Sequence, residues 1–346
     1  MAVICLILAT FFISSFSTNK ALQNKESLLL SPINVIFETD MGNDIDDVLA
    51  LDMLYKYADQ GKVKILAISN NKNSEYSNHY IDVLNTWYGY PDIPLATVKN
   101  GANSEGDAKD YVRAVSEFMT DGKLVFKRSI TDYSKVMEST RLYRKILSQQ
   151  PDNSVTIISV GFSTNLARLL DTPADEFSPL PGKELIRKKV KLLSTMAGNF
   201  LPGENKEYNV MKDPAAAQKV FAQWPTPIVL SPFEVGMVIH YPATSIRNDF
   251  TWTKNHPLVL GFETYKTMPY DAPAWDLTAV LYAIEGKEGY FDISPSGRIS
   301  VDENTFTHFQ EDKLGMHKYL KINPELTGKV RARFIELITT KPKFQK

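Results

Sequence analysis

Hydrophobic residues are spaced along the chain in a pattern that predicts strands alternating with helices. The apolar, partly β-branched run from Ile33 to Phe37 is typical of a buried strand. The apolar residues that follow recur at the spacing of one helix face as far as Ala58. They are Val48, Leu51, Leu54 and Tyr55. We therefore expect a strand–loop–helix unit over residues 33–58.

The same alternation continues toward the carboxyl terminus. Strands are predicted over residues 62–69, 91–97, 154–160, 189–196 and 226–230. Helices are predicted around residues 80–87, 136–149 and 214–224. This order favours the α/β class, with a mainly parallel open sheet flanked by helices, as in Rossmann-like folds.

Two stretches lack this pattern. Residues 99–135 are polar and contain Gly and Asp, so we expect them to run over the surface. For residues 285–346 the sequence predicts a role in packing and no other role. Because the sequence contains no repeat, low-complexity tract or linker, we expect one domain over residues 31–346, preceded by a leader at residues 22–30.

The amino terminus predicts export of the protein. Residues 1–21 contain an apolar run of signal-peptide length, followed by small and polar residues but preceded by no positive charge. The run is shorter than the ~20 residues of a membrane-spanning helix. We expect an exported protein, periplasmic or secreted, with no stable membrane association once the signal is removed. Cys5 is the only cysteine, so the mature chain would have no disulfide.

Composition and charge exclude other classes. With 346 residues, of which 43% are hydrophobic, the chain can bury a full core, which excludes a disordered protein. A formal net charge of −1 gives no bulk attraction to nucleic acid. The single basic run, Arg187 to Lys191, is best explained as solvated charge. We therefore expect no nucleic-acid partner.

Carboxylates crowd the loop between the first strand and its helix, around Gly42. They are Glu38, Asp40, Asp44, Asp46 and Asp47. A helix amino terminus favours one or two carboxylates by about 0.3–1 kcal/mol each. No Lys or Arg lies between Ser31 and Tyr55 to offset the charge of all five carboxylates. Open α/β sheets place their sites at the carboxyl ends of strands. Oxygen ligands favour Ca²⁺, or less readily Mg²⁺. A solvated acidic loop is the alternative.

Two other acidic motifs do not fit this loop. An EF-hand that began at Asp40 would need Gly at its sixth position and Glu at its twelfth, but Gly42 is third and Leu51 is twelfth. A phosphatase with an aspartyl nucleophile would need D-x-D-x-T, but this chain begins with Glu38 and has Gly42 in place of Thr.

The segment ETDMGNDIDDVLAL resembles the D-x-D-x-G-x-D-D-x-x-A-L signature of the nucleoside hydrolases, which are calcium-dependent N-ribohydrolases. This chain departs from the signature in having two extra residues between Gly42 and the pair Asp46–Asp47. Asp44 can therefore compete with Asp46 for one family role.

Three later segments resemble the family in the same order along the chain. Residues 161–167 (GFSTNLA) are similar to the family's G-x-x-T-N-x-A turn. The segment that begins at Met196, MAGNFLPGENKEYNVMKDPAAA, is similar to the family's G-N, E-F-N and D-P-x-A-A elements. Residues 271–280 (DAPAWDLTAV) resemble its H-D-P-x-A segment.

The resemblance implies a Ca²⁺ site and a ribose site. The ion would be held by Asp40, Asp47, Asp276 and the backbone carbonyl of Val160, with Asp40 as the general base that removes a proton from a Ca²⁺-bound water. The substrate ligands would be Asp44 or Asp46, Asn70, Asn199 (or Asn205), Glu207 and Asn209.

One position changes the chemistry that the resemblance implies. Trp275 stands where many family members carry a histidine that is thought to protonate the departing base. An indole cannot act in this way, but it can stack on the base or line its pocket. The leaving group would then be activated by Tyr270, by a histidine from elsewhere, or by stacking on Trp275.

The function that the resemblance implies is hydrolysis of the N-glycosidic bond of ribonucleosides, yielding base and ribose for nucleoside salvage. The expected partner is a small-molecule riboside, and a homodimer or homotetramer is expected. Three alternatives stay open: a hydrolase of another N-riboside, a non-catalytic calcium-dependent riboside-binding protein, and a protein that binds calcium only for stability.

Overall fold

The computed structural model describes residues 31–102, 110–203 and 206–345. The predicted signal peptide at residues 1–21, the leader at 22–30 and the alternative ligand Asn205 lie outside this described part. Within it, no helix has the length and apolar character to cross a membrane.

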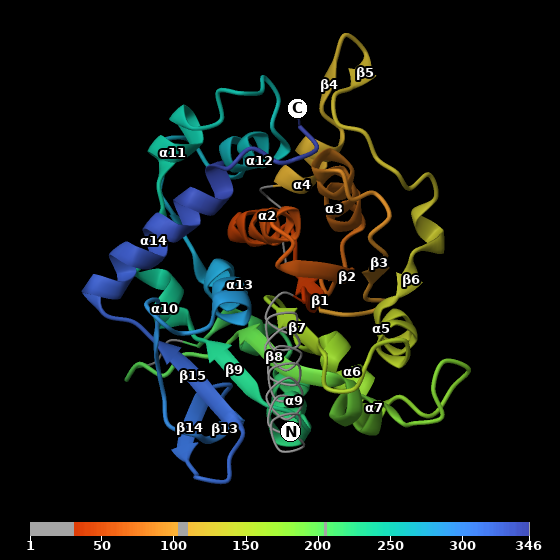
Figure 1. The fold of residues 1–346 in the computed structure, drawn as a ribbon, viewed down its shortest axis with the longest axis vertical. Coiled ribbons are helices and arrows are strands. Elements are labelled where there is room, and N and C mark those ends of the chain that lie inside the picture. Colours follow the sequence, from red (N-terminus) through yellow and green to blue (C-terminus); the bar gives the residue numbers. More distant parts are fainter. Residues whose placement is uncertain (1–30, 103–109, 204–205, 346) are drawn as a thin grey trace, which may run out of the picture.

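An eleven-stranded sheet forms the centre of the fold (Figure 1). Its order is β14, β13, β15, β9, β8, β7, β1, β2, β3 and β6, with β12 paired to β15. All neighbours from β15 to β6 are parallel, and β12, β13 and β14 add antiparallel pairs at the other end. The predicted mainly parallel open sheet is therefore confirmed.

The parallel strands are β1 (Ile33–Thr39), β2 (Val63–Asn70), β3 (Leu95–Thr97), β6 (Met137–Glu138), β7 (Val155–Ser159), β8 (Val190–Met196), β9 (Ile228–Ser231) and β15 (His317–Lys321). The antiparallel strands at the end of the sheet are β12 (Asp292–Ile293), β13 (Gly297–Val301) and β14 (Thr307–Glu311). Shorter pairs are β4 (Met119–Thr120) with β5 (Lys123–Leu124), and β10 (His240–Tyr241) with β11 (Ala272–Pro273).

Helices cover both faces of the sheet (Figure 1). One layer contains α2 (Asp46–Asp59), α3 (Glu75–Tyr88), α4 (Tyr111–Ser116), α12 (Pro257–Tyr265), α13 (Trp275–Glu285) and α14 (Pro324–Thr339). The other contains α5 (Ser139–Ser148), α6 (Thr164–Asp171), α7 (Gly182–Lys189) and α9 (Pro214–Gln223). The remaining helices are α8 (Tyr208–Lys212), α10 (Phe233–Met237), α11 (Ala243–Asn248) and the 3₁₀ turn Tyr133–Lys135.

The structure differs from the sequence expectation in residues 99–135. A short helix, α4, lies within this stretch and buries Tyr111, Val112 and Val115 in the core. The polar residues on both sides of α4 obscured the apolar periodicity of this short helix in the sequence. The carboxyl-terminal residues 285–346, which indicated only packing, supply four strands of the sheet and the helix α14.

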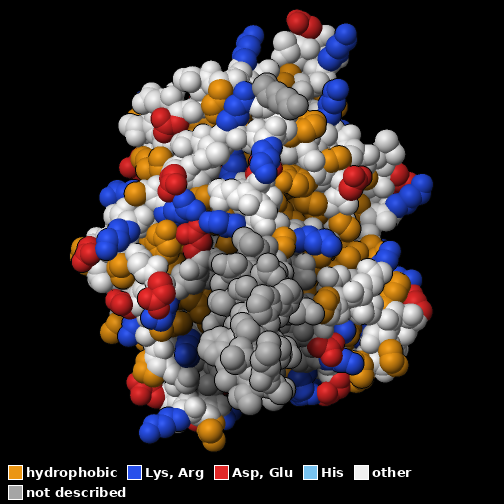
Figure 2. All heavy atoms as spheres, viewed as in Figure 1, with side chains coloured by type: hydrophobic (Ala, Val, Ile, Leu, Met, Phe, Trp, Pro, Cys, Tyr) orange, Lys and Arg blue, Asp and Glu red, His pale blue; other side chains and the backbone are white. Residues whose placement is uncertain are grey.

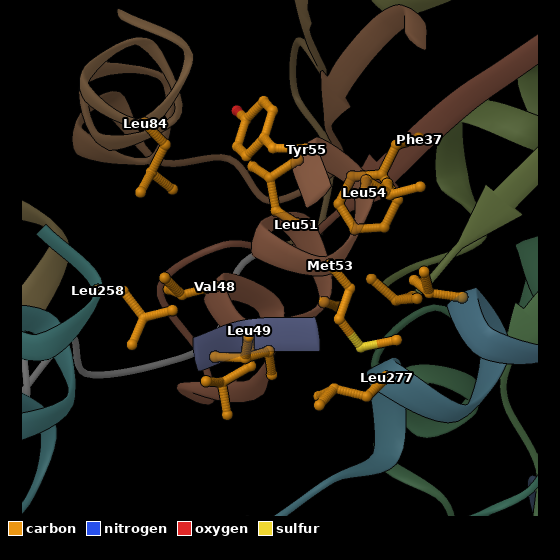
Figure 3. Packing of buried hydrophobic residues seen from close by; sticks show 14 of the residues in the cluster. Phe37, Val48, Leu49, Leu51, Met53, Leu54, Tyr55, Leu84, Leu258 and Leu277 are labelled. Atoms are coloured by element: carbon orange, nitrogen blue, oxygen red, sulfur yellow. The ribbon is translucent and has the colours of Figure 1, made fainter. Parts of the chain in front are cut away.

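Helix α2 is the most enclosed element of its layer. Figure 3 shows Phe37, Leu84, Leu258 and Leu277 around it, from β1, α3, α12 and α13. The sequence predicted one apolar face, but every residue from 46 to 57 is buried. Even Lys56 is buried on this helix, where its ammonium lies 3.6 Å from Asp52 and donates to the carbonyl of Thr340.

Positive and negative side chains are mixed on the surface, as the near-neutral net charge leads us to expect. In the view of Figure 2, basic and acidic side chains of the described residues are interspersed over the surface that they cover. The basic residues Arg187 to Lys191 end α7 and begin β8. This surface offers no extended basic patch for a nucleic acid among the described residues shown.

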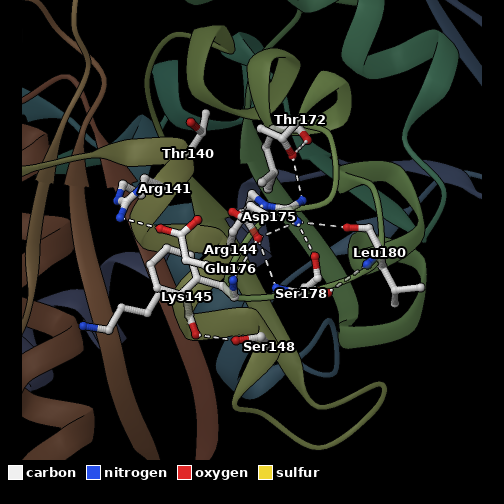
Figure 4. A network of polar contacts seen from close by, with 12 residues as sticks. Thr140, Arg141, Arg144, Lys145, Ser148, Thr172, Asp175, Glu176, Ser178 and Leu180 are labelled. Carbon is white, nitrogen blue, oxygen red and sulfur yellow. Dashed lines mark hydrogen bonds and ion pairs between the residues drawn. The ribbon is translucent and has the colours of Figure 1, made fainter.

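A buried arginine fixes the loop that follows α6 (Figure 4). Arg144 on α5 is 2% exposed, and its guanidinium donates to both carboxylate oxygens of Asp175, at 2.6 and 2.8 Å. It also donates to the carbonyls of Ser178 and Leu180, at 3.1 and 2.9 Å. These bonds lower the pKa of Asp175 to about 2.

Replacing Arg144 should destabilise the fold strongly. Arg144→Met leaves two carbonyls without their donor and leaves the carboxylate of Asp175 with only the backbone N–H groups of Phe177 and Ser178. We therefore expect a loss of about 3–5 kcal/mol in the free energy of unfolding. Arg141→Met on the same helix removes only an exposed ion pair to Glu176 and should cost less than about 1 kcal/mol. Urea unfolding at pH 7 measures both, and equal losses would contradict this role for Arg144.

Candidate active site

The order of the strands creates a crevice beside β1. From β1 the chain proceeds to β2 and β3 on one side, and later to β7, β8 and β9 on the other. At such a reversal, the loops that leave the carboxyl ends of the strands diverge and leave room for a ligand. Asp40 follows β1 and Val160 follows β7, so both residues stand at this position.

A small cavity of about 70 Å³ opens at this crevice. Its lining residues are Asp40, Asn43, Asp44, Asp46, Asp47, Val160, Met196, Glu207, Tyr208, Asn209, Phe233, Trp275 and Asp276. The sequence-predicted residues are therefore brought together here, except Asn70 and Asn199. Among the described residues that line the cavity there is no lysine, arginine or histidine.

Asp40 is 4% exposed and lies at the start of the acidic loop. Its Oδ2 accepts a hydrogen bond from the Nδ2 of Asn43. Burial raises the pKa of Asp40 to about 7, the Asn43 hydrogen bond and the charge of Lys72 oppose this rise, and the charge of Asp44 adds to it. Such a carboxyl can accept a proton near neutral pH.

Asp46 connects α2 to α13. Its Oδ2 accepts hydrogen bonds from the backbone N–H groups of Trp275 and Asp276, at 2.9 and 3.0 Å. These groups lie at the amino terminus of α13, where N–H groups lack intrahelical partners and the helix dipole favours an anion. Asp46 therefore fixes the position of Asp276 relative to the acidic loop.

Asp47 and Asp276 complete the buried acids. The hydroxyl of Thr39 donates to Asp47, which is 1% exposed, and Asp276 is 5% exposed. Burial raises the pKa of both carboxyls well above the ordinary value, and the charges of the neighbouring acids, Asp40 and Asp46 among them, raise both further. The acids thus repel one another across the cavity.

The donor set has the chemistry of a hard divalent cation, because carboxylates and a backbone carbonyl are the ligands that Ca²⁺ prefers. The same repulsion would be relieved by an ion. Among the described residues, however, no three His, Cys, Asp or Glu side chains are already arranged as a metal site. The ligands present fit an ion in kind, and they would have to move together to enclose it.

Two residues that the sequence analysis did not select hold the acidic loop. Lys72 is 1% exposed, and its ammonium donates to the carbonyl of Gly42 at 3.2 Å. The hydroxyl of Tyr111 on α4 accepts the Gly42 N–H at 3.1 Å and donates to the carbonyl of Asp44 at 2.7 Å. No sequence motif marks either residue, because the groups that Lys72 and Tyr111 bind on the loop are backbone atoms.

Glu207, Asn209 and Val160 form the opposite wall. The carboxylate of Glu207 caps α8 and accepts the N–H groups of Asn209, Val210 and Gly198, at 2.7, 3.0 and 3.1 Å. Burial nevertheless raises its pKa to about 7. The amide of Asn209 donates to the Val160 carbonyl at 3.3 Å and so orients that oxygen.

Asn70 lies away from the cavity. Its side chain folds back on its own turn, donating to the Lys72 carbonyl at 2.7 Å and accepting the Lys72 N–H at 3.0 Å. The next residue, Asn71, is fully buried and neither its Oδ1 nor its Nδ2 has a partner among the described residues. The register explains this difference, because Thr39 pairs with Asn70 and the following residue is therefore level with Asp40.

Asn199 also lies outside the acidic cavity. Its Oδ1 accepts the Leu201 N–H at 3.0 Å, and the residue lines a neighbouring groove with Phe200, Phe309 and Tyr319. That placement follows from the turn after β8, which carries the Asn199 side chain away from the acids.

Trp275 and Asp44 form the outer side of the cavity. The indole stacks on Phe233 with ring centroids 5.7 Å apart, and its Nε1–H donates to the Phe233 carbonyl at 3.1 Å. Asp44 is exposed, and its Oδ1 accepts the hydroxyl of Tyr265 at 2.5 Å. Asp44 thus faces the cavity mouth, whereas Asp46 is committed to the amino terminus of α13.

Comparisons with known proteins agree with this architecture. A family model described as inosine-uridine preferring nucleoside hydrolase matches residues 35–329. The chain belongs to this family, and membership supports an enzyme that hydrolyses the N-glycosidic bonds of ribonucleosides. A comparison with curated protein sequences finds no match.

Solved structures share the fold at low sequence identity. A plant nucleoside hydrolase, the PpNRh1 enzyme, has a TM-score of 0.68 and 18% identity over 90% of this chain and 100% of its own. The inosine-uridine preferring nucleoside hydrolase from Bacillus anthracis gives 0.64 and 16%, over 88% and 99%. The type III effector protein XopQ, complexed with adenosine diphosphate ribose, gives 0.64 and 14%, over 89% and 94%.

The ion-free protein should lose stability as the pH rises. Burial raises the pKa of Asp40 and Glu207 to about 7, and raises those of Asp46, Asp47 and Asp276. A carboxyl whose pKa is higher in the folded state contributes stability below its unfolded pKa, and that contribution is lost as the pH rises through the folded pKa. We therefore expect the melting temperature in chelator to fall between about pH 4 and pH 7.

Two variants test whether the acidic cluster causes this dependence of melting temperature on pH. Asp47→Asn removes one raised carboxyl and should flatten the dependence of melting temperature on pH, whereas Asp249→Asn changes an exposed acid and should leave it unchanged. Equal slopes in all three proteins would show that the cluster does not cause the pH dependence.

Gly161 should tolerate no side chain. A Cβ there would lie 2.5 Å from Asn71 Oδ1 and 2.7 Å from the backbone nitrogen of Asp40, so Gly161→Ala must displace the acidic loop. We expect a stability loss of about 1–3 kcal/mol. Gly328→Ala in α14, where the added Cβ meets nothing within 4 Å, should instead stabilise by up to about 1 kcal/mol. Thermal unfolding of both variants measures the difference.

Proposed function

We propose that this protein hydrolyses the N-glycosidic bond of ribonucleosides to free base and ribose, with Ca²⁺ as its cofactor. The observation that carries the proposal is the convergence of Asp40, Asp47 and Asp276, from two distant parts of the chain, on one cavity beside the Val160 carbonyl. Family membership supports the reaction class, and the carboxylate and carbonyl donors support a hard divalent ion such as Ca²⁺.

Asp40, Asp47, Asp276 and the Val160 carbonyl are the groups that would hold the ion. When bound, Ca²⁺ would bind the ribose hydroxyls and lower the pKa of a nearby water. Burial raises the pKa of Asp47 and Asp276, and the ion would relieve the repulsion between acids that raises these pKa values further.

Asp40 is the residue that would remove the proton from the attacking water. Its carboxylate is oriented by the Asn43 amide, which leaves its other oxygen for the water. A positioned general base contributes about 10²- to 10⁴-fold to the rate. Asn209 and Glu207 supply polar groups that would hold the sugar, as its anomeric carbon takes on oxocarbenium character.

A second candidate is a calcium-dependent riboside-binding protein without turnover. The indole N–H of Trp275 is too weakly acidic to protonate a departing base, and it is already bonded to the Phe233 carbonyl. Retained riboside affinity with no release of ribose would favour this candidate over a hydrolase.

Two expectations about the protein's setting stay predictions. Export rests on residues 1–21, which lie outside the described residues. A dimer or tetramer rests on the resemblance to the family. Secretion of the full chain and light scattering of the purified protein would test them.

Asp40→Asn should abolish most of the activity. We expect the rate of ribose release from a panel of purine, pyrimidine and nicotinamide ribosides to fall about 10²- to 10⁴-fold, because the base is lost while the oxygen contacts are kept. Chelation should have a similar effect that added Ca²⁺ reverses. Asp249→Asn, an exposed acid, is the matched control. Full activity in Asp40→Asn would contradict the assignment of the base.

A further inference from the structure

A cavity of about 730 Å³ lies at the edge of the sheet opposite the acidic site. Trp224 and Pro225 line it just before β9 begins, and Met316 lines it just before β15 begins. The cavity therefore lies at the amino-terminal ends of parallel strands, whereas the acidic cavity lies at carboxyl ends. Among the described residues the two cavities share no lining residue. The proposed reaction thus makes no use of this space.

The walls of this cavity come from both halves of the chain. Helices α7 and α9 supply one wall, and β13 with the residues before β15 supplies the other. Helix α9 and strand β13 lie toward the lower end of the view in Figure 1. Binding sites for small molecules have volumes of about 300–1,000 Å³, so the cavity has the size of a ligand site.

Positive charge lines the cavity without matching negative charge. Lys183 and Arg187 on α7 and Arg298 on β13 line it, and its described lining contains no Asp or Glu. Two acids outside the lining pair with the arginines: Glu184 with the Nη1 of Arg187, and Asp312 with the Nε of Arg298 at 2.6 Å. A guanidinium has five N–H donors, so each arginine keeps donors for a further acceptor.

His317 adds a buried donor to this wall. It is 7% exposed, and its Nδ1 accepts the N–H of Ile299 at 3.0 Å. A neutral imidazole has one acceptor nitrogen and one N–H, so the proton is on Nε2. Burial and the charge of Arg298 lower the pKa of His317 to about 4, and the ring therefore stays neutral at pH 7. Because Nε2 has no partner among the described residues, its N–H is available at the cavity wall.

Apolar side chains form another part of the wall. Phe221 and Trp224 are buried, and the Nε1–H of Trp224 donates to the hydroxyl of Thr226 at 2.9 Å, so the indole offers the cavity no donor. Leu314 and Met316, in contrast, are 86% and 47% exposed. Large apolar side chains left exposed beside a cavity favour an apolar ligand surface that covers them.

We propose that this cavity binds an amphipathic organic anion, whose carboxylate or phosphate group contacts Arg187, Arg298 and His317 while its apolar body covers Met316 and Leu314. Guanidinium groups bind the paired oxygens of carboxylates and phosphates with two parallel hydrogen bonds. The neutral His317 donates through Nε2 and adds no charge. The site is far larger than a bare inorganic anion requires, and its apolar wall calls for a carbon body. Binding here does not depend on the proposed ribohydrolase function.

The experiment compares three probes that share one ring system: 1-naphthyl phosphate, 1-naphthoate and the uncharged 1-naphthalenemethanol. Isothermal titration calorimetry of the full chain with Ca²⁺ measures each affinity. We expect one saturable site for at least one of the two anions, with an affinity about 10-fold or more above that of the alcohol, because charge-assisted hydrogen bonds contribute a factor of this order. The tighter anion identifies the preferred head group. Equal affinity for the alcohol, or no binding of either anion, overturns the proposal.

Two exposed substitutions locate the bound anion. Arg298→Gln removes one guanidinium, and Met316→Glu adds a carboxylate beside the cavity, so each should weaken binding of the tighter anion about 10-fold or more. Arg141→Gln on α5 removes an exposed arginine that is paired with Glu176, and this matched control should leave the affinity unchanged. Thermal unfolding verifies that the variants fold. Unchanged affinity in folded Arg298→Gln and Met316→Glu would place the anion elsewhere and overturn the proposal.

Discussion

Repulsion among buried carboxyl groups is the constraint on which the rest of this structure depends. Asp40, Asp46, Asp47 and Asp276 are each 5% exposed or less, and burial raises the pKa of all four. The charges of Asp40, Asp46 and Asp47 raise the pKa of Asp276 further. The Thr39 hydroxyl donates to Asp47, and the Asn43 amide donates to Asp40. The fold supports this cluster with the charge of Lys72, the dipole of α13 and, in the proposed function, a divalent ion.

The cluster exists because two helices meet at it. Helix α2 brings Asp46 and Asp47, and α13 brings Asp276, with the two backbone hydrogen bonds to Asp46 joining them. Helix α2 is buried on all sides from residue 46 to residue 57, so this junction lies inside the fold. Lys56 ties the same helix to the end of α14, so the carboxyl-terminal residues support the site without reaching it.

Trp275 shows how one residue can change the chemistry within a common framework. Its backbone N–H takes part in the junction with Asp46, while its indole is bonded to Phe233. The position therefore keeps its structural role, and its side chain supplies an aromatic surface and no proton.

The sequence by itself determined the α/β class and the order of the central strands and helices along the chain, because apolar periodicity indicates which faces of each element are buried. The resemblance of its motifs to those of the nucleoside hydrolases also selected Asp40, Asp46, Asp47, Glu207, Asn209 and Asp276, all of which line the cavity. Only the tertiary structure showed that the Asn70 side chain folds back on its own turn, because its partners are backbone atoms of Lys72. Only the tertiary structure placed Lys72 and Tyr111 on the acidic loop, because they bind backbone atoms that carry no side-chain signature.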